Sequence, residues 1–303
     1  MCPRVPVAIS SDARPRPRAV SVTTMLAFAY VCAFVATLWV PFVVADAARR
    51  APGALERGAC VELMGAVDWT LASLLLFNAV NALICVWEIA LWVHRENVQR
   101  LHEGYMKKFG DKVRGSARET RERVRGTRER ETRETRRLTE PNDTDVARAQ
   151  VLPSPLCLFE DISLSQALSL KYWSIIFAQY ASLDPSYVQH TSWSFWIDVG
   201  NGFTTLIPTV ALSIAVTGFP VVPLIASISP RTLGVVTVVM NYQMLYGTVF
   251  YFVNYRHNRY HEGASAGSRA VVLFANLVWI IGPSAWIIVG LGFVRSNDLT
   301  IAL

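Results

Sequence analysis

Charged residues are scarce in this chain of 303 amino acids, at 17% of the sequence, whereas soluble domains carry about 25%. This shortage argues against an ordinary soluble enzyme. The charge is also unevenly placed, because residues 107–140 contain 13 Lys or Arg and 7 Asp or Glu and so account for the whole net charge of +6. Since the rest of the chain is neutral, we expect no nucleic-acid partner for it.

Cysteine is also infrequent. The five cysteines fit no disulfide framework, zinc motif or redox motif, so we interpret them as small apolar residues. The sequence also lacks a GxSxG nucleophile elbow, a P-loop, an HExxH motif and a dinucleotide-binding fingerprint. His257 and His261 have a helical spacing, but no Cys or third His lies close by, so we predict neither a metal site nor a cofactor.

Long apolar segments are what the sequence has in abundance. Each of five segments is long enough to cross a bilayer, which takes about 20 helical residues. Several begin or end near Trp and Tyr, the residues that anchor helices at membrane interfaces. The sequence therefore predicts an all-α, multi-pass membrane helix bundle. The five segments are residues 23–45, 66–93, 193–219, 232–255 and 270–294.

The polar sequence outside these segments defines the domain organisation. Residues 1–20 predict a disordered tail, and residues 105–155 predict a charged linker that is disordered or partly helical. An alternative for this linker is contact with anionic lipid headgroups or RNA. We assign residues 21–104 to the first two spans, 156–295 to an interfacial helix with the last three spans, and 296–303 to a short tail.

Residues 160–182 predict one amphipathic helix that lies at the membrane interface. Ser163 and Gln166 match a capping box, and apolar residues follow at helical spacing until Asp184-Pro185 ends the helix. Packing on a soluble domain is the alternative, although the sequence leaves no room for such a domain.

Two carboxyl residues lie within the apolar segments, where ionisable groups are costly and are functional candidates by default. Glu88 lies about six residues before the end of the second span, and Asp198 about five residues after the start of the third. One long loop joins these two span ends, so both side chains lie on the same side of the membrane, roughly 8–10 Å below its boundary at about 1.5 Å per residue. In an apolar pocket a carboxyl group keeps its proton, so it can act as an acid near neutral pH.

Polar and aromatic side chains of the other spans fall at a similar depth. We expect them to line one pocket with Glu88 and Asp198, and hydrogen bonding that only joins the helices is the alternative. These candidate ligand-binding residues are Asn276 and Trp279 in the last span, Tyr246 and Tyr251 in the fourth, and Asn201 one turn after Asp198.

Three stretches together carry a family resemblance. They read YASLDPSY at residues 180–187, with Asp198 eleven residues later, YGTVFYF at 246–252, and FANLVW at 274–279, with Pro283 beyond. Their order and spacing resemble the emopamil-binding protein family, whose EXPERA-type membrane domain occurs in sterol Δ8–Δ7 isomerases and the sigma-2 receptor. The resemblance covers residues 66–95 and 170–294.

This resemblance implies a location in the endoplasmic reticulum membrane and a reaction without a cofactor. By motif position, Glu88 and Asp198 correspond to the acid and base of the isomerases, and Asn276 and Trp279 correspond to ligand contacts. One acid would protonate a ring alkene of a sterol, Trp279 would stabilise the carbocation, and a base would remove a neighbouring proton, as in cholestenol Δ-isomerase activity. We also consider a homodimer as an alternative to a monomer.

The chain departs from the isomerases at three positions. Ile84 replaces a histidine one turn before the span-two glutamate, Asp198 is shorter than the usual glutamate, and Thr248 replaces an aspartate. Three hypotheses therefore remain open: a sterol isomerase-like enzyme, a non-catalytic protein that binds a sterol or another amphipathic ligand, and a membrane adaptor whose charged segment binds a partner.

The orientation in the membrane is also open. The distribution of Lys and Arg favours a cytoplasmic position for the N-terminus, the charged linker and the loop at 256–269, whereas the resemblance implies the opposite. Asn142-Asp143-Thr144 is a glycosylation sequon, so a glycan there would show that this segment is lumenal.

Overall fold

The structure is a computed structural model that describes residues 25–104, 106, 161–218, 225, 227–261, 266–299 and 301. The expected N-terminal tail and nearly all of the charged linker, with its glycosylation sequon, lie outside these residues.

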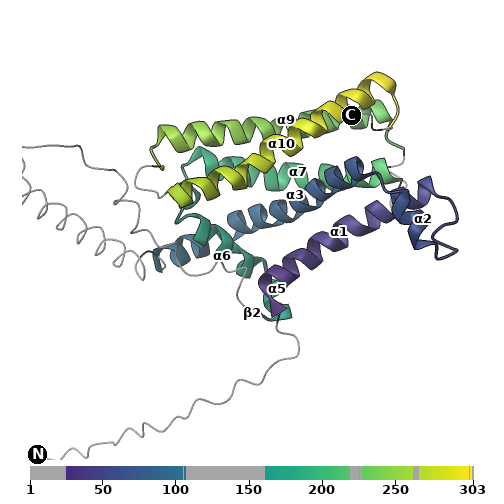
Figure 1. The fold of residues 1–303 in the computed structure, drawn as a ribbon. Coiled ribbons are helices and arrows are strands. Elements are labelled where there is room, and N and C mark those ends of the chain that lie inside the picture. The colour runs from purple at the N-terminus through teal and green to yellow at the C-terminus, as the bar shows by residue number, and fades with distance from the viewer. Residues whose placement is uncertain are drawn as a thin grey trace, which may run out of the picture.

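Five helices are long and apolar enough to cross a membrane by length and composition, which confirms the all-α class and is consistent with an integral, multi-pass membrane protein. Their bounds lie close to the predicted apolar segments. Figure 1 shows them side by side, with α6 at one end of the bundle and α2, Cys60–Gly65, at the other. The five are α1, Ala27–Arg50; α3, Trp69–Val93; α7, Trp193–Thr217; α9, Pro230–His257; and α10, Ala266–Ser296.

Capping residues fix where the long helices begin. The Asp68 side chain accepts hydrogen bonds from the backbone N–H groups of Thr70 and Leu71 at the start of α3, and it also forms an ion pair with Arg50 at the end of α1. Ser229 caps α9 in the same way, with Pro230 in the first turn. These local contacts satisfy N–H groups that a helix leaves unpaired at its first turn.

The segment before α7 differs from the prediction. A single helix over residues 160–182 is wrong, because the chain forms α5, Leu164–Ala167, and then a separate α6, Leu170–Tyr180. The predicted capping box of Ser163 and Gln166 is present on α5, and Ser169 caps α6 anew. A 3-10 turn, η3, follows at Pro185–Val188, with Asp184 as its cap.

Helix α6 packs on α3 and on the helical residues 95–104 that follow it. Trp173 of α6 stacks on Trp87 with ring centroids 5.6 Å apart, and Asn97 donates a hydrogen bond of 3.1 Å to Ser174. The short antiparallel pair β1, Met25–Leu26, with β2, Asp161–Ile162, joins the start of α1 to this segment. The chain between α3 and α7 therefore folds back onto one end of the bundle.

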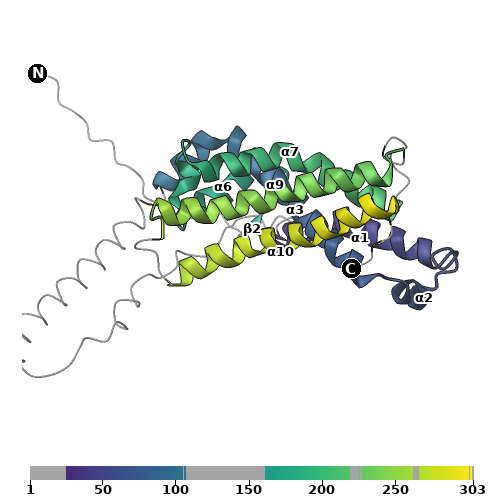
Figure 2. The ribbon, with the colours of Figure 1, turned by 90° about the horizontal axis from the view of Figure 1, so that it is seen from above.

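The last two helices approach most closely at the opposite end. Figures 1 and 2 show α9 and α10 diverging toward α6 and converging toward the C-terminus. Where they converge, a Cβ atom on Gly234 would lie 2.6 Å from the carbonyl oxygen of Gly290. Only glycine allows these two backbones to touch, because any side chain at residue 234 would separate the helices.

Candidate functional site

Polar side chains of α3 pair with those of α7 at successive helical turns. We call these residues the α3–α7 seam. Because residues three and four apart share one face of a helix, each turn adds one pair. The pairs are Asn78 with Ser213 at 2.9 Å, Asn81 with Thr209 at 2.9 Å, and Cys85 with Thr205 at 3.1 Å.

Glu88 and Asp198, the carboxyl pair, continue the seam by one further turn. Glu88 is only 4% exposed, and its carboxyl group interacts electrostatically with that of the partly buried Asp198. Gly202 makes this proximity feasible, since a Cβ atom there would lie 2.8 Å from the Cβ of Glu88. Within the described residues, no Lys, Arg or His forms a salt bridge with either carboxyl group.

A second group of polar side chains, the Asp184 network, lies next to the carboxyl pair. Tyr251 donates a hydrogen bond of 2.6 Å to the Asp184 carboxyl group, and its hydroxyl lies 3.5 Å from that of Tyr180. Asn276 in turn donates to the Tyr180 hydroxyl at 3.1 Å. Tyr187 connects this network to the carboxyl pair, because it is a hydrogen-bonding partner of Asp198.

Burial governs the protonation of the residues that precede α7. It raises the pKa of Asp184 above its ordinary value, although the hydrogen bonds from Tyr251 and from the Ser186 backbone act in the opposite direction. Burial also raises the pKa values of Tyr180 and Tyr187, so both phenols keep their protons and can donate hydrogen bonds.

The predicted site residues fall into two sets. Tyr251 and Asn276 belong to the Asp184 network, beside the carboxyl pair. Asn201 is buried on α7 and accepts a hydrogen bond of 3.1 Å from Gln243 of α9. Tyr246 and Trp279 lie apart from the pair.

Tyr246 and Trp279 each pack against another aromatic ring, away from the carboxyl pair. Tyr246 is 42% exposed on the outer face of α9, where its ring packs on Phe250 at 4.4 Å. The Trp279 ring packs edge-on against Phe77 at 6.0 Å. Phe77 lies eleven residues before Glu88 on α3, which corresponds to about 16 Å along the helix axis.

The sequence reasoning missed several polar residues of the site. Asp184 was expected only to end a helix, and Tyr180 and Tyr187 appeared only within the family motif. Cys85 and Gly202 were also missed as site residues. The spacing of Cys85 on α3, between the seam position at 81 and the carboxyl at 88, is a signal that could have revealed it.

Metal-ligand geometry is not found at this site. Among the residues that the structure describes, no group of three His, Cys, Asp or Glu side chains could hold a metal ion. His261, one of the two histidines considered above, has its Nε2 atom 3.3 Å from a guanidinium nitrogen of Arg256.

Comparisons of the chain with protein-family models, curated proteins and solved structures found no match.

Proposed function

We propose that this integral membrane protein binds a sterol or a similar ring-containing lipid beside the carboxyl pair and transposes a carbon–carbon double bond in it, as the sterol isomerases that its motifs resemble do. The observation that carries this proposal is the carboxyl pair itself. Glu88 and Asp198 come from different spans, interact with each other and have no cationic partner among the described residues.

The reaction needs only a proton donor and a proton acceptor. One carboxyl group protonates the ring alkene and leaves a tertiary carbocation. A carboxylate then removes a proton from the neighbouring carbon, and the electrons of that C–H bond form the new double bond. The net change is a moved double bond with no proton gained or lost. Because Trp279 packs against Phe77, we assign the aromatic face beside the cation to Tyr187, the partner of Asp198.

Binding without catalysis is a second candidate, and two residues favour it. Ile84 packs on the apolar core near the carboxyl pair, where the isomerases carry a histidine. Thr248 donates its hydroxyl hydrogen to the Met244 carbonyl within α9, at 2.9 Å. Neither side chain can carry a proton to a ligand. Under this candidate, a sterol or an amphipathic ligand binds beside the same carboxyl pair, in the manner of a receptor.

Expression of the full chain in cells that lack Δ8–Δ7 isomerase tests the enzyme. We expect Δ8 sterols to be converted to Δ7 sterols, with the protein in the endoplasmic reticulum membrane. Glu88→Gln and Asp198→Asn should each lower conversion by about 10²-fold or more, the contribution of a general acid or base. Glu62→Gln is the matched control, since Glu62 is well exposed in an ion pair with Arg57.

A sterol profile that stays rich in Δ8 sterols with the unaltered chain contradicts the enzyme. Crosslinking of a photoreactive sterol then tests the second candidate, which predicts labelling that Glu88→Gln together with Asp198→Asn abolishes. Labelling that survives both changes contradicts ligand binding beside the carboxyl pair. The adaptor hypothesis loses its basis if deletion of residues 107–140 leaves the co-purifying proteins unchanged.

A further inference from the structure

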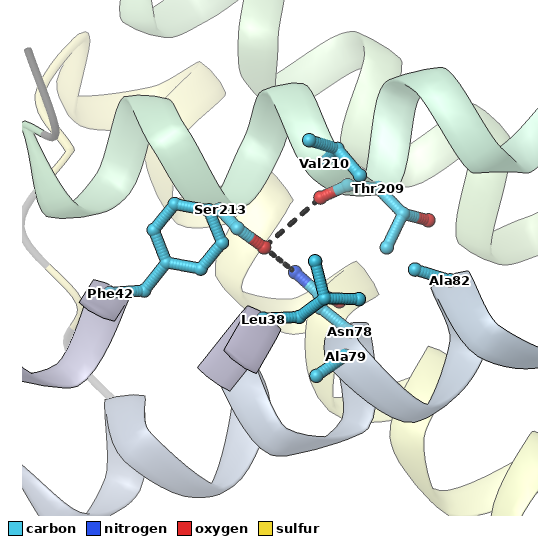
Figure 3. A pocket seen from close by; sticks show the side chains of 8 residues that line it. All are labelled: Leu38, Phe42, Asn78, Ala79, Ala82, Thr209, Val210 and Ser213. Carbon is cyan, nitrogen blue, oxygen red and sulfur yellow. Dashed lines mark hydrogen bonds between the residues drawn. The ribbon is translucent and has the colours of Figure 1, made fainter. Parts of the chain in front are cut away.

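A small cavity lies between α1, α3 and α7, away from the carboxyl pair. Figure 3 shows the side chains that line it: Leu38 and Phe42 from α1, Asn78 from α3, and Thr209 and Ser213 from α7. Asn78 lies ten residues before Glu88 on α3, which is about 15 Å along the helix axis. The cavity is therefore distinct from the site proposed above.

The hydrogen bonding around Asn78 is incomplete. Its amide nitrogen donates to the Ser213 hydroxyl at 2.9 Å, and Asn78 is only 2% exposed. The amide oxygen has no hydrogen-bond donor in the described part of the chain. The hydrocarbon core of a bilayer contains no bulk water that could donate a hydrogen bond to such an atom. Leaving the amide oxygen unpaired is therefore costly.

Exchanging the oxygen and nitrogen of the Asn78 amide does not remove the problem. The Ser213 hydroxyl donates to the Thr209 carbonyl at 3.1 Å, so it is available to Asn78 only as an acceptor. In the exchanged orientation, the amide oxygen would be paired only if the Ser213 hydroxyl gave up its bond to the Thr209 carbonyl, and the amide nitrogen would be the unpaired atom. The observed orientation is therefore the better one, and it requires a donor for the oxygen.

The cavity has the size of one hydroxyl group. Its volume is about 10 Å³, which is close to the smallest space that holds a single water molecule. Leu38 and Phe42 are only partly buried on α1, a peripheral helix with most of its surface outside the bundle. The surrounding membrane therefore lies close to the cavity.

We propose that this cavity binds one O–H group that donates a hydrogen bond to the Asn78 amide oxygen. The group is either a water molecule or the hydroxyl of a membrane lipid, which share this chemistry. This O–H group would complete the hydrogen bonding of the α3–α7 seam at the end farthest from the carboxyl pair. The proposal does not depend on the proposed function, because neither carboxyl group takes part in it.

The test is a density map, at a resolution that shows water, of the full chain in lipid nanodiscs. Three compositions are compared: phosphatidylcholine alone, phosphatidylcholine with cholesterol, and phosphatidylcholine with cholestane, which has the same rings without the hydroxyl. A compact peak beside Asn78 in all three identifies water. Extended density only with cholesterol identifies a lipid hydroxyl. A cavity without density in all three overturns the proposal.

Two matched variants test the role of the amide. Asn78→Leu should remove the density and lower the thermal midpoint by about 2–4 °C, the shift expected for one lost hydrogen bond in a domain of this size. Asn241→Leu is the control, because Asn241 is equally buried with an unpaired amide oxygen but does not line this cavity. Density that persists in Asn78→Leu overturns the proposal.

Discussion

His102 is a residue whose titration reports on the packing of the segment between α3 and α7. It is partly buried, and its Nδ1 atom lies 3.3 Å from the carbonyl oxygen of Ala178 in α6. Burial lowers the pKa of His102 below its ordinary value of 6.5, against the opposing effects of Ala178 and Glu103. The unfolded chain therefore binds this proton more readily than the folded chain does.

The sign of the pH effect follows from this difference. The contribution of His102 to stability is fully present above pH 6.5 and is lost as the pH falls through the lower folded-state pKa. We expect helical residues 95–104 to exchange their amide hydrogens faster, after correction for intrinsic rates, when the pH is lowered below 6.5. His102→Gln should flatten this dependence. An unchanged dependence in that variant would contradict the assignment.

Residue types alone identified the carboxyl pair but not Asp184. Glu88 and Asp198 stand out because they interrupt apolar runs, where charge is costly. Asp184 lies outside the spans, and Asp-Pro is an ordinary helix stop, so its sequence context carries no such signal. It is fully buried only because α6 and η3 fold back onto the bundle. That burial depends on long-range contacts, which a local pattern does not contain.

Among the helices, α3 and α7 have the contact on which the candidate site depends. A Cβ atom at Gly202 would lie 2.8 Å from the Cβ of Glu88 and 3.0 Å from the carbonyl oxygen of Cys85. We expect Gly202→Ala to push the helices apart and to destabilise the protein by about 1–3 kcal/mol, as overpacking does. If the proposed function holds, conversion of Δ8 sterols should fall with it.

Gly200→Ala is the matched control for this prediction. A Cβ atom at Gly200 on the same helix would meet nothing within 4 Å, and alanine favours a helix over glycine by about 1 kcal/mol. This variant should therefore leave the thermal midpoint unchanged or raise it. Equal losses of stability in the two variants would contradict the assignment of the Gly202→Ala loss to its contact with Glu88.

Helix boundaries show which elements the sequence can predict. The long helices follow apolar runs, so their number and extent could be predicted closely. The break between α5 and α6 could not, because the apolar spacing continues across it. Leu168, which continues the apolar spacing of residues 160–182, lies at the break and is 78% exposed. The new cap at Ser169 and the bond from Trp173 to the Ala167 carbonyl decide the local geometry.

The whole molecule consists of two sequence regions that pack against each other mainly through α3 and α7. Helices α1 and α3 precede the charged linker, and α6, α7, α9 and α10 follow it. The α3–α7 seam and the carboxyl pair both lie where these regions meet. The candidate site thus takes its two carboxyl groups from opposite sides of the linker.

This arrangement predicts that the two regions can assemble as separate polypeptides. Residues 1–130 and 131–303, produced together without a peptide bond between them, should form a complex that co-purifies and, if the proposed function holds, converts Δ8 sterols. The short pairing of β1 with β2 should add to the association. Fragments that carry Asn81→Leu with Thr209→Val keep every span but lack one seam hydrogen bond, so their recovery as a complex should fall.

Failure of the unaltered fragments to associate would show that the covalent connection is needed for assembly. Success would mean that the chain behaves as two separately folding membrane parts that the linker joins covalently. The linker would then keep the two parts at a ratio of one to one and at a high local concentration. The linker could then vary in length and composition without disturbing the site, since the described contacts between the two parts lie outside it. They are the α3–α7 seam, the packing of α6 on α3 and the pairing of β1 with β2.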